Sequence, residues 1–235
     1  MKKMIIFLTV FVLIFTSAAP MASARNYLSS VELNCDVDYL ISLDTGAVIM
    51  SKNENKKVPI ASVTKITTAL VVLQKCKDLS EVVTVTSTAL HTLDGTGSSL
   101  SGLKVGEEVT VLQLLHLLLI ASGNDAAVTL AEHFGGTQEQ FVSMMNECAA
   151  SLGCKDTHYN NPHGLDTKDG YSTAHDIAII AQAALKYDVF TKIVGTANYT
   201  VEQTNKNQKR SIVNTNSTMN PTYLSYYRSY VKGIK

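Results

Sequence analysis

Three serines in the sequence are each followed three residues later by a lysine, a spacing that suits nucleophilic catalysis. On a helix this spacing places the hydroxyl and the amine on one face, one turn apart, so that the amine can take the proton of the hydroxyl. The three pairs are Ser62 and Lys65, Ser101 and Lys104, and Ser229 and Lys232. Spacing alone does not choose among them, because it occurs three times in one chain.

The sequence around Ser62 distinguishes this pair from the other two. Ser62 stands in the first turn of a predicted helix, since the apolar residues over 63–73 recur at helical spacing. Ser101 lies beside a glycine in a loop, and Ser229 lies in a polar stretch. The positive end of the helix dipole favours a developing alkoxide at Ser62. Lys65 can act as a base only if burial or a nearby cation lowers its pKa toward 7; otherwise Ser62 is an N-cap and Lys65 a solvated side chain.

A second group, Ser122-Gly123-Asn124, lies at a predicted break between two helices. A rigid turn of this kind projects a hydroxyl and an amide, which suit proton relay and the binding of a substrate carbonyl. The alternative is that these residues only cap the two helices, with Asn124 as the N-cap of the second. Lys235 is the third candidate, although a lysine at this position indicates nothing by itself.

The elements that must position these residues follow from hydrophobic periodicity and capping signals. A β-hairpin is predicted over 37–50 and strands over 194–201 and 210–214, while helices make up the middle of the chain. The first helix is predicted to begin near Ala61 or Ser62. Further helices are predicted over 111–121, where Thr110 and Gln113 form a capping box, over 125–134, from Thr137 to a point before Gly153, and over 174–187, which Thr173 caps. This order predicts an α/β fold (α+β layers) in which the N- and C-terminal strands share one sheet.

Composition and charge exclude several classes of protein. The 235 residues include 20 Lys and Arg against 20 Asp and Glu, so the chain has no basic field to hold nucleic acid, and no nucleic-acid partner is expected. With 13 Gly and 4 Pro, the chain is neither collagen-like nor of low complexity. A globular protein with a sizeable core is therefore predicted.

The first 24 residues have the pattern of a secretory signal peptide. Two lysines precede an apolar run over 4–15, and Ala22-Ser23-Ala24 supplies a cleavage site. The run is shorter than the roughly 20 residues that span a bilayer, which disfavours the alternative of an uncleaved anchor. We therefore predict an exported, extracytoplasmic protein of the cell envelope, with a signal peptide over 1–24 and a mature domain over 25–235.

Four cysteines lie in this mature domain, and export would permit disulfides among them. They are Cys35, Cys76, Cys148 and Cys154, which can pair in three ways, and the sequence does not choose among the three. Their spacing does not match that of a zinc site, so no metal is predicted.

In order along the chain, Ser62-Val63-Thr64-Lys65, Ser122-Gly123-Asn124 and Lys235 after Gly233-Ile234 resemble the S-x-x-K, S-x-N and K-T-G elements of penicillin-binding proteins and serine β-lactamases. Further matches narrow the resemblance to the exported serine-type D-alanyl-D-alanine carboxypeptidases, the low-molecular-mass penicillin-binding proteins of peptidase family S11. These matches are Pro59 to Thr68, Ser122 to Ala126, Asn161 to Leu165, Tyr171 to Asp176 and Asn214 to Asn216. The resemblance covers residues 27–235.

The resemblance implies the fold shared by serine β-lactamases and penicillin-binding transpeptidases, and a Ser-Lys acyl-transfer mechanism without a cofactor. Ser62 would attack the carbonyl of the penultimate D-alanine of a peptidoglycan stem pentapeptide, with Lys65 as the general base. Ser122 would relay a proton to the leaving D-alanine. Asn124 and Lys235 would bind the substrate, Lys235 at its terminal carboxylate. β-Lactam antibiotics are the implied covalent inhibitors.

Departures from the family pattern leave two alternatives open. The sequence ends at Lys235, before the Thr and Gly of K-T-G, so we expect a catalytic domain that is truncated at its C-terminus, with membrane attachment only through sequence beyond that point. A non-catalytic binder of penicillin or peptidoglycan is the first alternative. A serine β-lactamase is the second, although Ser122-Gly123-Asn124 stands where the class A enzymes have S-D-N, and residues 160–166 offer no glutamate.

Overall fold

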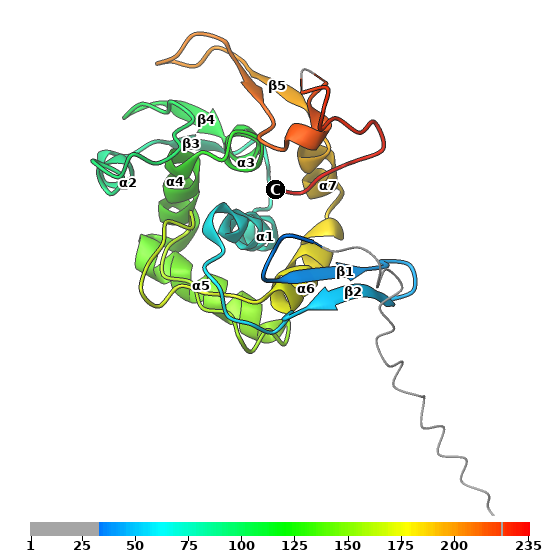
Figure 1. The fold of residues 1–235 in the computed structure, drawn as a ribbon. Coiled ribbons are helices and arrows are strands. Elements are labelled where there is room, and N and C mark those ends of the chain that lie inside the picture. Colours follow the sequence, from blue (N-terminus) through cyan, green and yellow to red (C-terminus); the bar gives the residue numbers. More distant parts are fainter. Residues whose placement is uncertain (1–32, 222) are drawn as a thin grey trace, which may run out of the picture.

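The computed structural model describes residues 33–221 and 223–235, so the predicted signal peptide lies outside the described residues. Helix α1 (Lys65–Lys75) stands at the centre of the fold, and its first eight residues are all buried. A helix that is buried all round must meet neighbours on several sides. Those neighbours are α3 (Val111–Leu119), α4 (Asn124–Gly135), α5 (Gln138–Ser151) and α6 (Ala174–Leu185), which surround α1 in Figure 1.

Threonine caps set the start of three of these surrounding helices. Thr110 forms the predicted capping box, because its hydroxyl accepts a hydrogen bond from the Gln113 N–H (3.2 Å) while the Gln113 side chain accepts one from the Thr110 N–H (2.8 Å). Thr137 and Thr173 each accept from the backbone N–H three residues further on. The predicted starts of α3, α5 and α6 are therefore confirmed.

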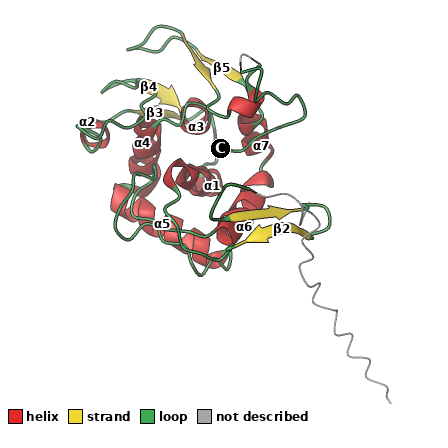
Figure 2. Cartoon of the chain, viewed as in Figure 1, coloured by secondary structure: helices red, strands yellow, loops and turns green. Residues whose placement is uncertain are grey.

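The strands lie outside this helical centre as antiparallel pairs, drawn in yellow in Figure 2. Within the described residues they are β1 (Asp38–Ile41) with β2 (Val48–Lys52), β3 (Val82–Thr84) with β4 (Glu108–Thr110), and β5 (Asn198–Val201) with β6 (Arg210–Val213). The predicted N-terminal hairpin is confirmed. The prediction that N- and C-terminal strands share one sheet is wrong for the described residues, because the strands form three separate two-stranded sheets and residues 231–235 pair with neither β1 nor β5.

Short helices complete the described chain. They are η1 (Ala61–Thr64), α2 (Ser87–His91), α7 (Asp188–Val194) and η2 (Ser217–Met219). The strand predicted over 194–201 begins only at Asn198, because the residues before it form α7 and bury Phe190 and Ile193 in the core.

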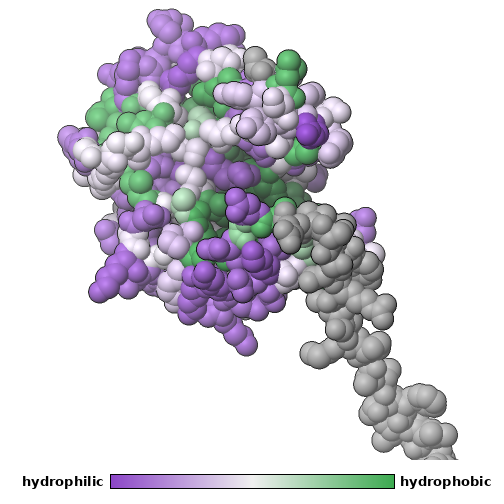
Figure 3. Space-filling view, viewed as in Figure 1, coloured by the Kyte–Doolittle hydropathy of each residue, from purple (hydrophilic) through white to green (hydrophobic). Residues whose placement is uncertain are grey.

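No helix among the described residues is both long and apolar enough to cross a bilayer. The face drawn in Figure 3 is hydrophilic above and below, with apolar residues gathered between.

The four cysteines, whose pairing the sequence left open, are free thiols in the structure. Cys148 and Cys154 are buried, and burial raises the pKa of the Cys154 thiol to about 12. A thiol with so high a pKa stays protonated near neutral pH and is a poor nucleophile. In the described part of the chain, no group of three or more His, Cys, Asp or Glu side chains is placed to hold a metal ion.

Candidate active site

Ser62 and Lys65 meet where η1 runs directly into α1. The Lys65 side chain has no exposed surface, and its Nζ donates hydrogen bonds to Ser62 Oγ (2.9 Å) and to the carbonyl oxygen of His163 (2.7 Å). The structure therefore brings the predicted hydroxyl and amine into direct contact.

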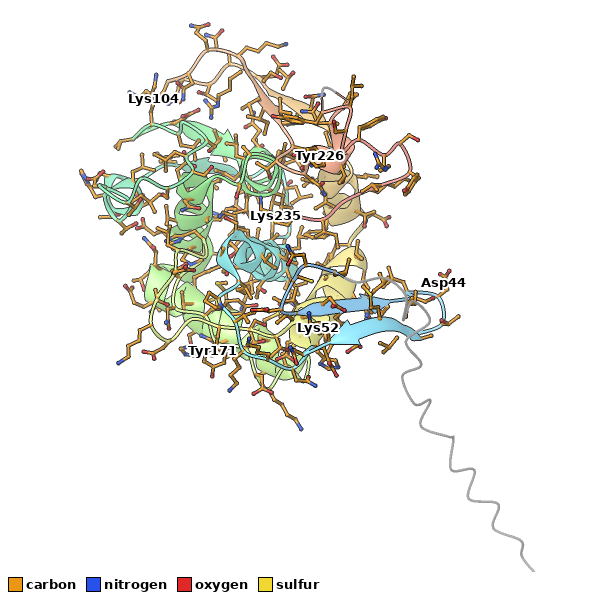
Figure 4. The ribbon with its side chains drawn as sticks, viewed as in Figure 1. Asp44, Lys52, Lys104, Tyr171, Tyr226 and Lys235 are labelled. Carbon is orange, nitrogen blue, oxygen red and sulfur yellow. The ribbon has the colours of Figure 1, made fainter. Side chains whose placement is uncertain are left out.

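The other two Ser-x-x-Lys pairs do not form such a contact. The amine of Lys104 donates instead to the carbonyl oxygen of Lys206 (3.3 Å), while Ser229 and Lys232 are exposed. Figure 4 shows Lys104 at the periphery of the molecule and Lys235 near its centre. The choice of Ser62 and Lys65 by sequence context thus agrees with the burial that the structure gives them.

Burial makes the ammonium group of Lys65 acidic enough to lose its proton near neutral pH. Desolvation of the amine is the main cause that lowers its pKa to about 7; the positive charge of Lys235 acts in the same direction, and the negative charge of Asp125 opposes both. The amine is therefore neutral in a substantial fraction of molecules at pH 7. This meets the condition that the sequence set for Lys65 to act as a base.

The loop over 160–165 supplies the second acceptor for Lys65. The Asn161 side chain holds this loop closed, because its Oδ1 accepts from the N–H groups of His163 (3.2 Å) and Gly164 (2.6 Å) and its Nδ2 donates to the Leu165 carbonyl (2.8 Å). The His163 ring is buried, and burial together with the nearby Lys65 charge lowers its pKa to about 4. The ring therefore stays neutral at the pH where Lys65 titrates.

Gly164 allows the loop to approach the backbone of η1. Its φ of +87° is a conformation that favours glycine, and a Cβ at this position would collide with the carbonyl of Ala61. Ala61 itself has φ +45°, which is uncommon for a residue with a side chain. The backbone just before Ser62 is thus held in a strained conformation by a closely packed loop.

The Ser122-Gly123-Asn124 turn joins α3 to α4 beside this pair. Ser122 is buried and has φ +58°, a second positive value at a residue other than glycine. Asn124 is the first residue of α4 and does not cap it, because the N-cap is Gly123 and no side-chain cap bond forms there. The alternative role of Asn124 as an N-cap is therefore wrong.

Lys235 approaches the same place from the C-terminal segment. Its Nζ lies 3.4 Å from the carbonyl oxygen of Leu119, at the end of α3, and burial lowers its pKa to about 8. The Thr215 N–H donates to the carbonyl of Ile120 (3.1 Å), so the stretch that follows β6 is also fixed to this helix end. The amine of Lys235 therefore lies near enough to Lys65 for its positive charge to act on it.

A cleft of about 350 Å³ opens over these residues. It is lined by Ala61, Ser62, Ser98, Ser99, Asn124, His163, Gly164, Leu165 and Asp166. Of the predicted residues, Ser62 and Asn124 line the cleft directly, and Lys65 lies behind Ser62. The sequence pattern did not identify Ser98 and Ser99 as cleft residues. They lie in a Gly/Ser-rich stretch, a composition that is common in loops without any function.

Solved structures define the class of protein that this fold and cleft represent. The Streptomyces K15 DD-transpeptidase aligns with 80% of this chain and 77% of its own length, with a TM-score of 0.74 and 30% sequence identity. The evolved putative penicillin-binding protein homolog Rv2911 from Mycobacterium tuberculosis aligns with 80% of this chain and 70% of its own, with a TM-score of 0.73 and 34% identity. The predicted penicillin-binding-protein-like fold is thus confirmed.

Sequence comparison narrows the class to a family. A family model described as D-alanyl-D-alanine carboxypeptidase matches residues 24–235, and the chain belongs to that family. DacF of Bacillus subtilis is 38% identical over 220 residues, which cover 92% of this chain and 56% of DacF. DacA of Escherichia coli K12 is 34% identical over 187 residues, which cover 75% of this chain and 46% of DacA. The chain spans about half the length of these two relatives.

Because Gly164 packs on Ala61, we predict that Gly164→Ala lowers the free energy of unfolding more than Gly153→Ala does. Gly164 and Gly153 have nearly the same φ, +87° and +85°, but a Cβ at Gly153 would meet nothing within 4 Å. Gly153→Ala should cost only the left-handed backbone strain, about 1–2 kcal/mol. Gly164→Ala should lower the free energy of unfolding by more, as measured by denaturant titration. Equal losses would show that the contact with Ala61 is not tight.

Proposed function

We propose that this chain acts as a serine-type D-alanyl-D-alanine carboxypeptidase that removes the terminal D-alanine from peptidoglycan stem pentapeptides through an acyl-enzyme on Ser62. The observation that supports this most directly is the buried amine of Lys65, 2.9 Å from Ser62 Oγ and with a pKa of about 7. A base with a pKa near the working pH and in hydrogen-bond contact with a hydroxyl is what nucleophilic catalysis by serine requires.

In the acylation step, Ser62 Oγ attacks the carbonyl carbon of the penultimate D-alanine. Neutral Lys65 takes the hydroxyl proton as the new C–O bond forms. The peptide C–N bond then breaks, and Ser122 relays a proton to the nitrogen of the departing D-alanine. Water afterwards attacks the ester carbonyl and releases the shortened peptide with Ser62 restored.

Two further residues are proposed to hold the substrate during this step. Asn124 lines the cleft at the start of α4, where its amide can bind the peptide backbone of the substrate. Lys235 brings a positive charge near Lys65, and this charge would bind the terminal carboxylate while it favours the neutral form of Lys65. β-Lactams, which present a carboxylate and a reactive carbonyl together, are expected to acylate Ser62.

Export is a separate part of the proposal and rests on the N-terminal sequence. A peptidoglycan substrate lies outside the cytoplasm, and the basic, apolar and Ala-Ser-Ala order of residues 1–24 supplies a route to it. We place the mature protein in the cell envelope for this reason.

Covalent labelling tests the role of Ser62. A fluorescent penicillin should label the protein, and Ser62→Ala should abolish both the labelling and the release of D-alanine from a peptide that ends in D-alanyl-D-alanine. Ser229→Ala is the matched control, because Ser229 has the same spacing to a lysine but is exposed.

Three results of this test would contradict the proposal in different ways. Rapid penicillin hydrolysis without D-alanine release would favour a β-lactamase. Binding of muropeptides without any labelling would favour a non-catalytic binder. Labelling that survives in Ser62→Ala would place the nucleophile elsewhere.

The pH dependence of acylation tests the role of Lys65. The acylation rate should rise with pH along an acid limb with a midpoint at about 7, where Lys65 loses its proton. Lys235→Met removes a positive charge that lowers the pKa of Lys65, so it should move this limb to higher pH. Lys235→Arg keeps the charge and should leave the limb in place, as measured by stopped-flow labelling. A limb that does not respond to Lys235→Met would argue against electrostatic coupling of the two lysines.

N-terminal sequencing tests the export proposal. Protein recovered from the cell envelope should begin at Arg25, after the Ala22-Ser23-Ala24 site. Recovery of the chain only in the cytoplasm, with residues 1–24 attached, would refute export by cleavage.

A further inference from the structure

Asp125 follows the Ser-Gly-Asn turn in the first turn of α4 and is almost completely buried, with 1% of its surface exposed. A buried carboxylate is unfavourable unless hydrogen bonds or charges satisfy it. Its partners come mainly from one distant segment: the Ser101 N–H lies 2.9 Å from both carboxylate oxygens, the Ser101 hydroxyl donates at 2.8 Å, and the Leu103 N–H donates at 3.0 Å. These hydrogen bonds have a charged acceptor and are therefore among the stronger ones.

The segment that Asp125 holds is a wall of the cleft. Residues 98–103, which we call the wall segment, include Ser98 and Ser99 of the cleft lining. A second attachment lies one residue earlier, where the Asn124 N–H donates to the Ser99 carbonyl (2.8 Å). The wall segment is thus bound to the start of α4 at two residues, Asn124 and Asp125, and its Ser98 and Ser99 line the same cleft as Ser62.

Gly123, the middle residue of the turn, provides the space for this contact. Its φ of −65° is ordinary, so backbone conformation does not require glycine here. A Cβ, however, would lie 2.7 Å from Asp125 Oδ1 and 2.8 Å from both Cβ and Oγ of Ser101. Any larger residue would push the wall segment away from Asp125.

Asp125 also affects the charge balance of the Ser62–Lys65 pair. The ionisable groups that act on Lys65 are Lys235, which favours the neutral amine, and Asp125, which favours the charged one. The His163 ring stays neutral beside them. A change at Asp125 therefore alters both the position of the wall segment and the protonation of Lys65.

We propose that Asp125 is a positioning residue of the acylation site: its carboxylate fixes the wall segment against α4 and provides a negative charge that acts on the Ser62–Lys65 pair. This inference rests on the proposed acyl-transfer function for its kinetic consequences. The attachment of the wall segment itself can be tested without any activity.

Asp125→Asn tests both parts, because it keeps the shape of the side chain and removes the charge and one acceptor. Amide hydrogen exchange at Ser101 and Leu103, followed by NMR, should become about tenfold or more faster, since one of the two acceptor oxygens is lost and the other no longer carries charge. Acylation by the fluorescent penicillin should slow by about tenfold as the wall segment loses its position. The acid limb of acylation should move to lower pH, a shift that loss of stability alone would not produce.

Glu107→Gln is the matched control for burial of a carboxylate. Glu107 has no exposed surface, accepts hydrogen bonds from the Lys104 N–H (3.0 Å) and Arg210 Nη1 (3.0 Å), and is not among the residues that line the cleft. This variant should lose stability but keep slow exchange at Ser101 and Leu103 and an unmoved acid limb.

Gly123→Ala keeps the proposal testable if Asp125→Asn does not fold. It displaces the wall segment and leaves the charge, so acylation should slow while the acid limb stays in place. Unchanged exchange at Ser101 and Leu103 in Asp125→Asn, or wild-type acylation in Gly123→Ala, would overturn the inference. Failure of the wild-type protein to take up penicillin would instead overturn the proposed function, while the exchange result would still decide the attachment of the wall segment.

Discussion

The rest of the site depends on the burial of one amine, that of Lys65. Removing an ammonium group from water costs several kcal/mol even after the protein relaxes, so the neutral form gains in relative stability. The helices around α1 impose this cost, and the fold offsets part of it by offering the amine two acceptors, Ser62 Oγ and the His163 carbonyl. Burial of Lys65 at the start of the central helix is therefore a cost to the folded state and the reason why the neutral amine is available near pH 7.

Segments far apart in the sequence are needed to complete this environment, and backbone groups hold most of them together. The His163 carbonyl reaches Lys65 from 98 positions along the chain, on a loop closed by the Asn161 side chain. Lys235 reaches the end of α3 from 116 positions away. Ser62 in η1 and Lys65 in α1, by contrast, are three residues apart, so the local backbone sets their relation.

The distinction between local and long-range contacts also separates the features that the sequence predicts from those that it does not. Helix starts at Thr110 and Thr173 depend on a side chain and an N–H three residues away, and both were predicted from sequence. The acceptor role of His163 was not predicted, because a backbone carbonyl has no residue-type signal. Strand partners were also misjudged, since pairing between the N- and C-terminal hairpins is a long-range property that periodicity within each hairpin does not determine. Motif order identified the family because it combines several local signals.

Ala61 and Ser122 both have positive φ values, and at both positions the needs of stability and of the proposed function differ. Glycine at either position would relieve the strain and favour the folded state. At position 61 it would also loosen the peptide unit that orients the nucleophile, and at position 122 it would remove a hydroxyl. Selection for stability alone would favour both exchanges, whereas selection for the proposed acyl transfer would reject the second and limit the first. Resistance to heat and competence in turnover are therefore opposing pressures at this site.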